Sequence, residues 1–173
     1  MKRTKKLALS AMLTAFSAVI LLIGKFASVL DLTTAVIASF AAVFAHMEMR
    51  APWSFYIWGA TSLLSLLLFP SNAAVYYAVF CGIYAILKAY FERLLPAPQW
   101  ILKLLSFNLL FTGAFGVMYL LGTFPPEFVG IGWLWAAVYA LGNVAFLCYD
   151  LVISRCILLY SYKLRKRIAK FLK

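Results

Sequence analysis

The chain has 173 residues, of which 66% are hydrophobic and only 12% are charged, and its mean hydropathy is +0.96. A soluble domain of this size could not bury so much apolar surface, so the composition excludes a water-soluble globular protein. The net charge of +11 is compatible with nucleic-acid binding, but the positions of the basic residues favour a membrane topology signal.

Six apolar runs follow one another along the chain. Because the hydrocarbon core of a bilayer needs about 20 apolar residues per helix, they predict an all-α integral membrane protein. We expect a six-transmembrane-helix bundle in a single domain, residues 1–173. The second run is short and spans only ~24 Å as a helix, so neighbouring helices should shield it. The runs lie at residues 7–30, 32–47, 53–69, 73–91, 101–124 and 128–153.

The basic residues predict the orientation. When the runs are threaded alternately through a membrane, fifteen of the sixteen Lys and Arg fall on one side and only Lys25 falls on the other. Such residues stay in the cytoplasm, so both termini should be cytoplasmic in a multi-pass protein of the cell membrane. A cleaved signal peptide would also begin with Lys2–Lys6. The uncharged stretch from Leu7 to Gly24 exceeds a usual signal-peptide core, however, and favours a retained helix.

The basic tail, residues 155–173, carries seven Lys and Arg between apolar residues at helical spacing. This pattern is typical of an amphipathic helix end that lies on anionic lipid headgroups. A plain helix end that carries topology charges explains the pattern equally well.

Chemistry-bearing motifs are sparse. The sequence has no glycine-rich nucleotide-binding loop, no Cys or His cluster and no nucleophile-elbow Ser, and His46 and Glu48 lack the spacing of a zinc-protease pair. The three cysteines have no paired spacing, so we expect them to be free and buried. We therefore predict neither an enzyme nor a cofactor or metal site.

Ala11 and Ala15 form a small-xxx-small step in the first run. Small residues let a second helix approach closely, and in lipid this packing replaces the missing hydrophobic driving force. The partner helix is either another helix of this chain or a helix of a different protein. The pattern alone leaves both alternatives open.

Polar side chains fall at mid-membrane depth in the last two runs. Trp135, Tyr139 and Asn143 lie on one stripe of the sixth run, and Asn108 lies at a similar depth in the fifth. Amides in hydrocarbon need partners, so Asn108 and Asn143 should either bond each other across helices or contact a ligand. Further along the stripe, Asp150 should pair with a basic residue such as Arg155 or Lys103.

The fourth run places Tyr77, Tyr84 and Lys88 on one face, and Lys88 and Glu92 form an i,i+4 pair. We expect Lys88 to extend to the membrane surface as a topology charge. Tyr76 and Tyr77 belong either to an interfacial aromatic belt or to the rim of an outward-facing pocket. Asp31 lies in the first outside loop, which is suited to cover such a pocket.

The chain resembles the substrate-binding S components of energy-coupling factor (ECF) transporters. The resemblance rests on its size, six runs and inside termini, and above all on the opening Lys5-Lys-Leu-Ala-Leu-Ser-Ala-Met-Leu-Thr-Ala15. The segments Ser62-Leu-Leu-Ser-Leu-Leu-Leu-Phe-Pro70, Tyr84-Ala-Ile-Leu-Lys88 and Phe91-Glu-Arg93 resemble one group within that family.

The resemblance implies a bacterial transport protein that captures a vitamin-like micronutrient from outside. A separate coupling subunit, docked at Ala11 and Ala15, and two ATPases would drive uptake. The ligand site would open outward, formed by the outer parts of the fourth to sixth helices and covered by the first loop. The outer half has few ionic groups, so a flat, apolar ligand fits best. The expected binding residues are Asp31, Tyr77, Asn108, Trp135, Tyr139 and Asn143.

Two other classes remain as alternatives. A non-transport scaffold similar to the rod-shape-determining D protein has a comparable length and helix count, and there the tyrosines and amides would only pack the bundle. A proton- or ion-coupled carrier is disfavoured because the chain has only five acidic residues.

Overall fold

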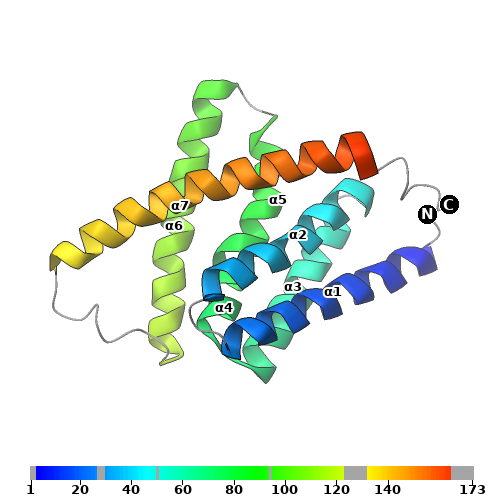
Figure 1. Cartoon of the computed structure of the whole chain (residues 1–173), viewed down its shortest axis with the longest axis horizontal. Coiled ribbons are helices and arrows are strands. Elements are labelled where there is room, and N and C mark those ends of the chain that lie inside the picture. The colour runs from blue at the N-terminus through cyan, green and yellow to red at the C-terminus, as the bar shows by residue number, and fades with distance from the viewer. Residues whose placement is uncertain (1–2, 27–29, 50, 94, 123–131, 165–173) are drawn as a thin grey trace.

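The computed structural model describes residues 3–26, 30–49, 51–93, 95–122 and 132–164, and these are helical throughout apart from short turns, with no strand among them (Figure 1). A helix covers most of each of the six predicted runs. The elements are α1 Arg3–Phe26, α2 Asp31–Met49, α3 Ala51–Leu68, α4 Asn72–Val75, the π-helix η2 Tyr76–Cys81, α5 Gly82–Phe91, α6 Pro96–Leu120, α7 Gly132–Leu159 and the π-helix η4 Tyr160–Leu164.

Five stretches are long and apolar enough to cross a membrane: Arg3–Phe26, Asp31–Met49, Asn72–Phe91, Ala97–Leu120 and Gly132–Tyr162. The third run, α3, is not among them. With 18 residues it is shorter than each of the five, near the lower end of the about 17–25 residues that cross a bilayer. An all-helical protein with five candidate spans is therefore established, and a sixth span through α3 stays a prediction.

The short helix α2 lies at the centre of the first half of the molecule. It packs against α1, α3, α5 and η2, and its buried positions are mostly small, including Ala35, Ala38 and Ala42. Helix α1 approaches closely at Gly24, where a Cβ atom would come within 2.3 Å of the Thr34 Oγ1 atom. Neighbouring helices thus shield α2, as its short apolar run predicts.

The fourth run is continuous but contains a π-helix, which the sequence pattern did not predict. Two side chains from other elements bond its carbonyl groups: the Trp58 indole N–H donates to Ala78 O at 2.9 Å, and the Tyr149 hydroxyl donates to Cys81 O at 2.9 Å. Gly82 makes room for Trp58, because a Cβ atom at this glycine would lie 2.5 Å from the Trp58 ring. Side chains from α3 and α7 thus hold the π-helix in place.

We predict that Trp58→Phe lowers the free energy of unfolding in detergent by ~1 kcal/mol, because the ring still fills the space beside Gly82 but Ala78 O loses a donor. Thermal unfolding followed by circular dichroism measures this. Trp133→Phe, at an exposed position on α7, is the matched control and should have no effect. Equal stability of both variants would contradict a role for the indole N–H.

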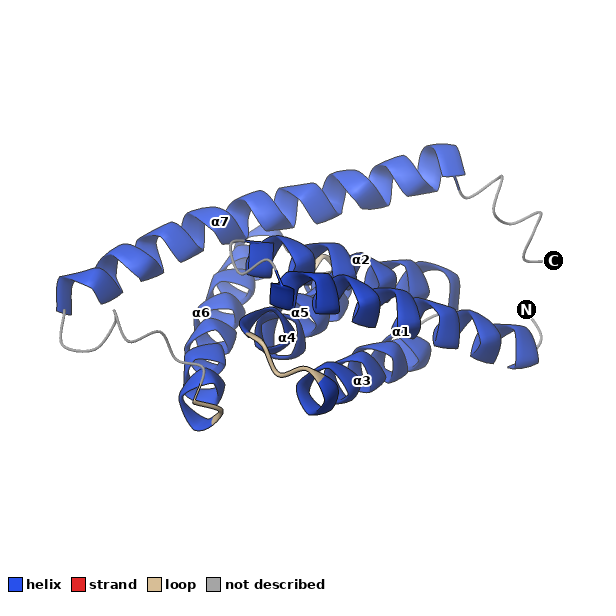
Figure 2. Cartoon of the chain, turned by 60° about the horizontal axis from the view of Figure 1, so that its bottom comes forward, coloured by secondary structure: helices blue, strands red, loops and turns tan. Residues whose placement is uncertain are grey.

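Helix α7 crosses α6 and α5 along one side of the molecule (Figures 1 and 2). Of its 28 residues only Phe146, Tyr149, Asp150 and Ile153 are buried, so the helix is held to the rest of the fold mainly around this short segment. This steep crossing differs from the side-by-side packing expected of a simple bundle. Because α7 crosses the other helices in this way, the contacts around Asp150 and the amide at Asn143 fix its position.

Candidate functional site

An aromatic cluster joins η2, α5, α6 and α7 in the middle of the fold. The Phe107 and Phe146 rings stack with centroids 4.7 Å apart, and Phe80 and Tyr84 pack their rings against Phe146 at 6.2 Å and 5.0 Å. Beside the cluster lies a small cavity of about 80 Å³. It is lined by Leu32, Val36, Tyr76, Phe80, Phe107, Phe111, Gly142, Ala145, Phe146 and Tyr149.

The two predicted mid-membrane amides bond each other. Asn108 Nδ2 donates to Asn143 Oδ1 and Asn143 Nδ2 donates to Asn108 Oδ1, each at 3.2 Å. The second N–H of each amide donates within its own helix, to Leu104 O at 2.9 Å and to Tyr139 O at 2.8 Å. The prediction that these amides bond across helices is confirmed, and the pair joins α6 to α7.

The other predicted binding residues occupy different places. Tyr139 hydrogen-bonds Thr112 at 2.7 Å and packs its ring edge against Phe111, and Trp135 packs against Phe115. Tyr77 is fully buried in the core rather than at a pocket rim, and Asp31 is half-buried at the start of α2. The structure therefore brings Asn108, Tyr139 and Asn143 together at the α6–α7 crossing. None of the six residues lines the aromatic cavity.

A buried ion network connects α5, α6 and α7, and we call its members Tyr84, Lys88, Glu92, Lys103 and Asp150 the Asp150 network. Asp150 Oδ1 accepts hydrogen bonds from the Tyr84 hydroxyl at 2.7 Å and from Lys88 Nζ, and Lys103 Nζ bonds Asp150 Oδ2 at 2.9 Å. Lys88 also donates to Asp150 O at 3.2 Å and pairs with Glu92 at 2.8 Å, and Glu92 lies 3.6 Å from Lys103.

The Asp150 network is shielded from solvent except at Glu92. The side chains of Lys88, Lys103 and Asp150 are only 1%, 2% and 4% exposed, whereas that of Glu92 is 38% exposed. Two cations face two anions, so the charges balance, and every Asp150 oxygen has a partner. Ionisable groups at such depth are costly unless paired in this way, and they mark functional sites in membrane proteins.

One expectation about the Asp150 network is wrong and another is confirmed. Lys88 does not extend to the membrane surface, because Asp150 and Glu92 hold it inside the protein. Of the two basic residues predicted to pair with Asp150, Lys103 does so, whereas Arg155 is exposed on α7. The i,i+4 spacing of Tyr84, Lys88 and Glu92 was the available signal for this site, but spacing on one helix does not identify partners on two others.

Ala11 and Ala15 lie on an open face. They are exposed and line a groove of about 390 Å³ between α1 and α3, whose walls include Tyr56, Ala60 and Leu64. The neighbouring face of α1 packs inside the protein, where the Ser17 hydroxyl donates to Ala38 O at 3.2 Å. Neither alanine is buried against another described helix of this chain, and docking of a partner helix at this pair stays a prediction.

No cysteine pair and no metal-ligand group forms among the described residues. All three cysteines are free, but only Cys81 is buried; Cys156 is half-buried and Cys148 is exposed, so the expectation of burial is wrong for Cys148. In the part of the chain that the structure describes, no three His, Cys, Asp or Glu side chains gather in a group that could hold a metal ion.

Comparison with family models, curated proteins and solved structures gave no match.

Proposed function

We propose that the chain is the membrane-embedded substrate-binding subunit of an ECF-type importer. It captures a vitamin-like micronutrient outside the cell and passes it inward together with a separate coupling subunit and two ATPases. The observation that carries this proposal is the open groove in which Ala11 and Ala15 lie. The chain itself acts as a binding protein and catalyses no reaction.

The groove has the properties of a helix-docking site. The small side chains of Ala11, Ala15 and Ala60 leave space in the groove, and the larger Tyr56 and Leu64 border it. A helix from a coupling subunit can approach closely there and gain van der Waals contacts that lipid tails do not provide as well. This is the role that the resemblance to S components implies for Ala11 and Ala15.

The proposed ligand site is the α6–α7 crossing and the aromatic cavity beside it. The cavity of about 80 Å³ is smaller than the ~300–1,000 Å³ of typical ligand pockets, so binding requires α7 to move away from α6. Such a movement would separate Asn108 from Asn143 and Tyr139 from Thr112. The released polar groups would then bond a ligand whose flat face lies against Phe107, Phe111 and Phe146. Trp135, Tyr77 and Asp31 would lie farther from its centre.

The proposed topology has six spans, including α3, with both termini in the cytoplasm of a bacterial cell. The distribution of Lys and Arg supports it. The start of α1 and the end of α7 also lie on the same side of the molecule (Figures 1 and 2). Packing of α3 against α1 and α2 would cover part of its polar surface within the bilayer.

A non-transport scaffold of the rod-shape-determining D type is the second candidate. The observation that favours it is the complete pairing of the two amides, which need no ligand to satisfy them. In that case the groove beside Ala11 would receive a helix of a cell-wall assembly.

Native mass spectrometry of the gently purified protein tests the two candidates. We expect a stoichiometric adduct of fixed, vitamin-sized mass. Lipid adducts alone, together with a co-purifying cell-wall protein, would instead support the scaffold.

Asn143→Leu tests the proposed ligand site. It should greatly reduce retention of the co-purified molecule but lower the free energy of unfolding by only ~1 kcal/mol, the usual contribution of an interhelical hydrogen bond in a membrane. Thr112→Val removes the neighbouring hydrogen bond to Tyr139 and is the control for loosening of the crossing. A large loss of stability with unchanged retention would make Asn143 a structural amide.

A further inference from the structure

A polar cleft lies between the first turns of α1 and α3. The two helices lie side by side and begin at the same end of the molecule (Figure 2). The cleft has a volume of about 490 Å³, within the ~300–1,000 Å³ of sites that hold small molecules. Its lining residues are Arg3, Thr4, Leu7, Trp53 and Tyr56.

This polar cleft continues into the apolar α1–α3 groove, because Leu7 and Tyr56 line both. From Arg3 to Ala15 the two together follow α1 for ~18 Å at the helical rise of ~1.5 Å per residue. A bilayer with its headgroup layers is ~40–45 Å thick, so one leaflet is ~20 Å thick. The combined length therefore matches one lipid molecule, with the polar cleft at the headgroup and the apolar groove along an acyl chain.

The charge of the polar cleft is positive. Arg3 is exposed and forms no ion pair with any described residue, and none of the described residues that line the cleft or the groove is acidic. A guanidinium donates two parallel hydrogen bonds to a phosphate group. The Trp53 and Tyr56 rings meet edge to face with centroids 6.0 Å apart, and such aromatic residues with polar tips are typical of the headgroup layer.

We infer that the polar cleft and the α1–α3 groove bind one anionic phospholipid, with its phosphate at Arg3 and an acyl chain over Ala11 and Ala15. A chain in the groove contacts two helices and gains more dispersion energy than a chain against one convex helix. Basic pockets between membrane helices bind anionic headgroups, whereas a zwitterionic headgroup carries an ammonium group for which this cleft has no carboxylate. The inference does not depend on the proposed transport function. A helix that docks in the groove would have to displace the lipid.

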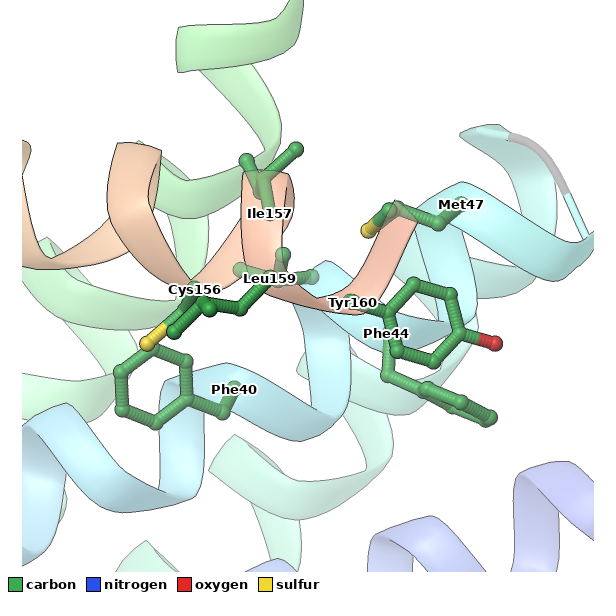
Figure 3. A pocket seen from close by; sticks show the side chains of 8 residues that line it. Phe40, Phe44, Met47, Cys156, Ile157, Leu159 and Tyr160 are labelled. Atoms are coloured by element: carbon green, nitrogen blue, oxygen red, sulfur yellow. The ribbon is translucent and has the colours of Figure 1, made fainter. Parts of the chain in front are cut away.

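A second apolar groove, of about 340 Å³ between α2 and the end of α7, serves as an internal comparison (Figure 3). Phe40 and Phe44 lie on one wall and Tyr160 on the other, and none of the described residues that line it is basic. The Tyr160 hydroxyl donates to Glu48 Oε1 at 2.8 Å, so the described charge beside this groove is negative. It offers space for an acyl chain without a described cation for an anionic headgroup.

Photolabelling of the full chain in phosphatidylcholine vesicles tests the inference. A trace of phosphatidylglycerol with a photoreactive group in its acyl chain is activated, and mass spectrometry locates the adducts. At residues 7–15 and 56–64, unlabelled phosphatidylglycerol should compete about fivefold better than phosphatidylcholine, the effect of one basic residue near a headgroup. At residues 40–47 this difference should be smaller. An absence of adducts at residues 7–15 and 56–64, or the same competition at both grooves, would overturn the inference.

Two pairs of variants sharpen the test. Arg3→Gln should abolish the preference for phosphatidylglycerol at residues 7–15, whereas Lys5→Gln, which removes the same charge from a residue outside the cleft, should keep it. Equal losses in both variants would show diffuse attraction to the membrane surface and no site. Ala15→Trp fills the groove and should remove the adducts at residues 56–64, whereas Met12→Trp, outside the groove, should keep them. Adducts that persist in Ala15→Trp would place the acyl chain elsewhere and contradict the inference.

Discussion

Asp150→Asn should be the most destabilising single substitution in this protein. The amide cannot balance Lys88 and Lys103, whose side chains are almost fully buried, so the two cations would share Glu92 as their one remaining counter-charge in the Asp150 network. Breaking a buried ion pair from one side typically costs ~3–5 kcal/mol. Chemical unfolding in detergent should show a loss of this size, together with release of α7 from α5 and α6.

Glu92→Gln is the matched control. It also removes one carboxylate from the Asp150 network, but Glu92 is 38% exposed, and water can solvate the lysines from its side. The free energy of unfolding should fall by less than about 1 kcal/mol, as for exposed ion pairs. Similar losses for Asp150→Asn and Glu92→Gln would show that Asp150 is more solvated than its burial indicates.

A triple variant separates the contribution of the Asp150 network to stability from its contribution to uptake. Lys88→Met, Lys103→Met and Asp150→Leu together replace the charges by apolar groups of similar size. Because apolar replacement of a whole buried ion cluster is often neutral or stabilising, most of the stability should return. A folded triple variant that no longer supports uptake would show that the charges act in function, whereas full uptake would limit them to stability.

The helices could be predicted from the sequence because each depends on local composition. Apolar runs bounded by charges and prolines locate all six, and the short second run correctly predicts that neighbours cover α2. The bond between Asn108 and Asn143 was one of the two outcomes that the sequence allowed, because both amides lie at a similar depth and amides in hydrocarbon need partners. In each case a physical requirement left few solutions.

Two pairs of the Asp150 network were predicted, Lys88 with Glu92 and Asp150 with Lys103. The joining of both pairs in one buried network could not be predicted, because it depends on how three helices cross. Lys88, Lys103 and Asp150 are far apart in sequence, and the positive-inside rule treats every lysine alike. The predicted topology does not depend on these two buried lysines. When Lys88 and Lys103 are removed from the sixteen basic residues, thirteen of the remaining fourteen still fall on the predicted cytoplasmic side.

Ala11→Trp and Ala15→Trp should abolish energised uptake while the isolated chain still binds its ligand. Both alanines are exposed in the α1–α3 groove, so an indole there lies in the open groove beside α3 and fills the space that a docking helix needs. Overpacking of a helix contact costs ~1–3 kcal/mol, which corresponds to ~5–150-fold weaker docking. Uptake in cells that contain the whole assembly, and ligand retention by the purified chain, measure the two effects.

Met12→Trp provides the control for these variants. Met12 is 70% exposed on another face of α1 and does not line the groove, so an indole there should leave both uptake and ligand retention unchanged. If Ala11→Trp and Ala15→Trp reduce uptake and ligand retention equally, the alanines support the ligand-binding fold itself. Loss of uptake alone, with Met12→Trp unaffected, would identify the α1–α3 groove as the surface that couples this chain to its energy source.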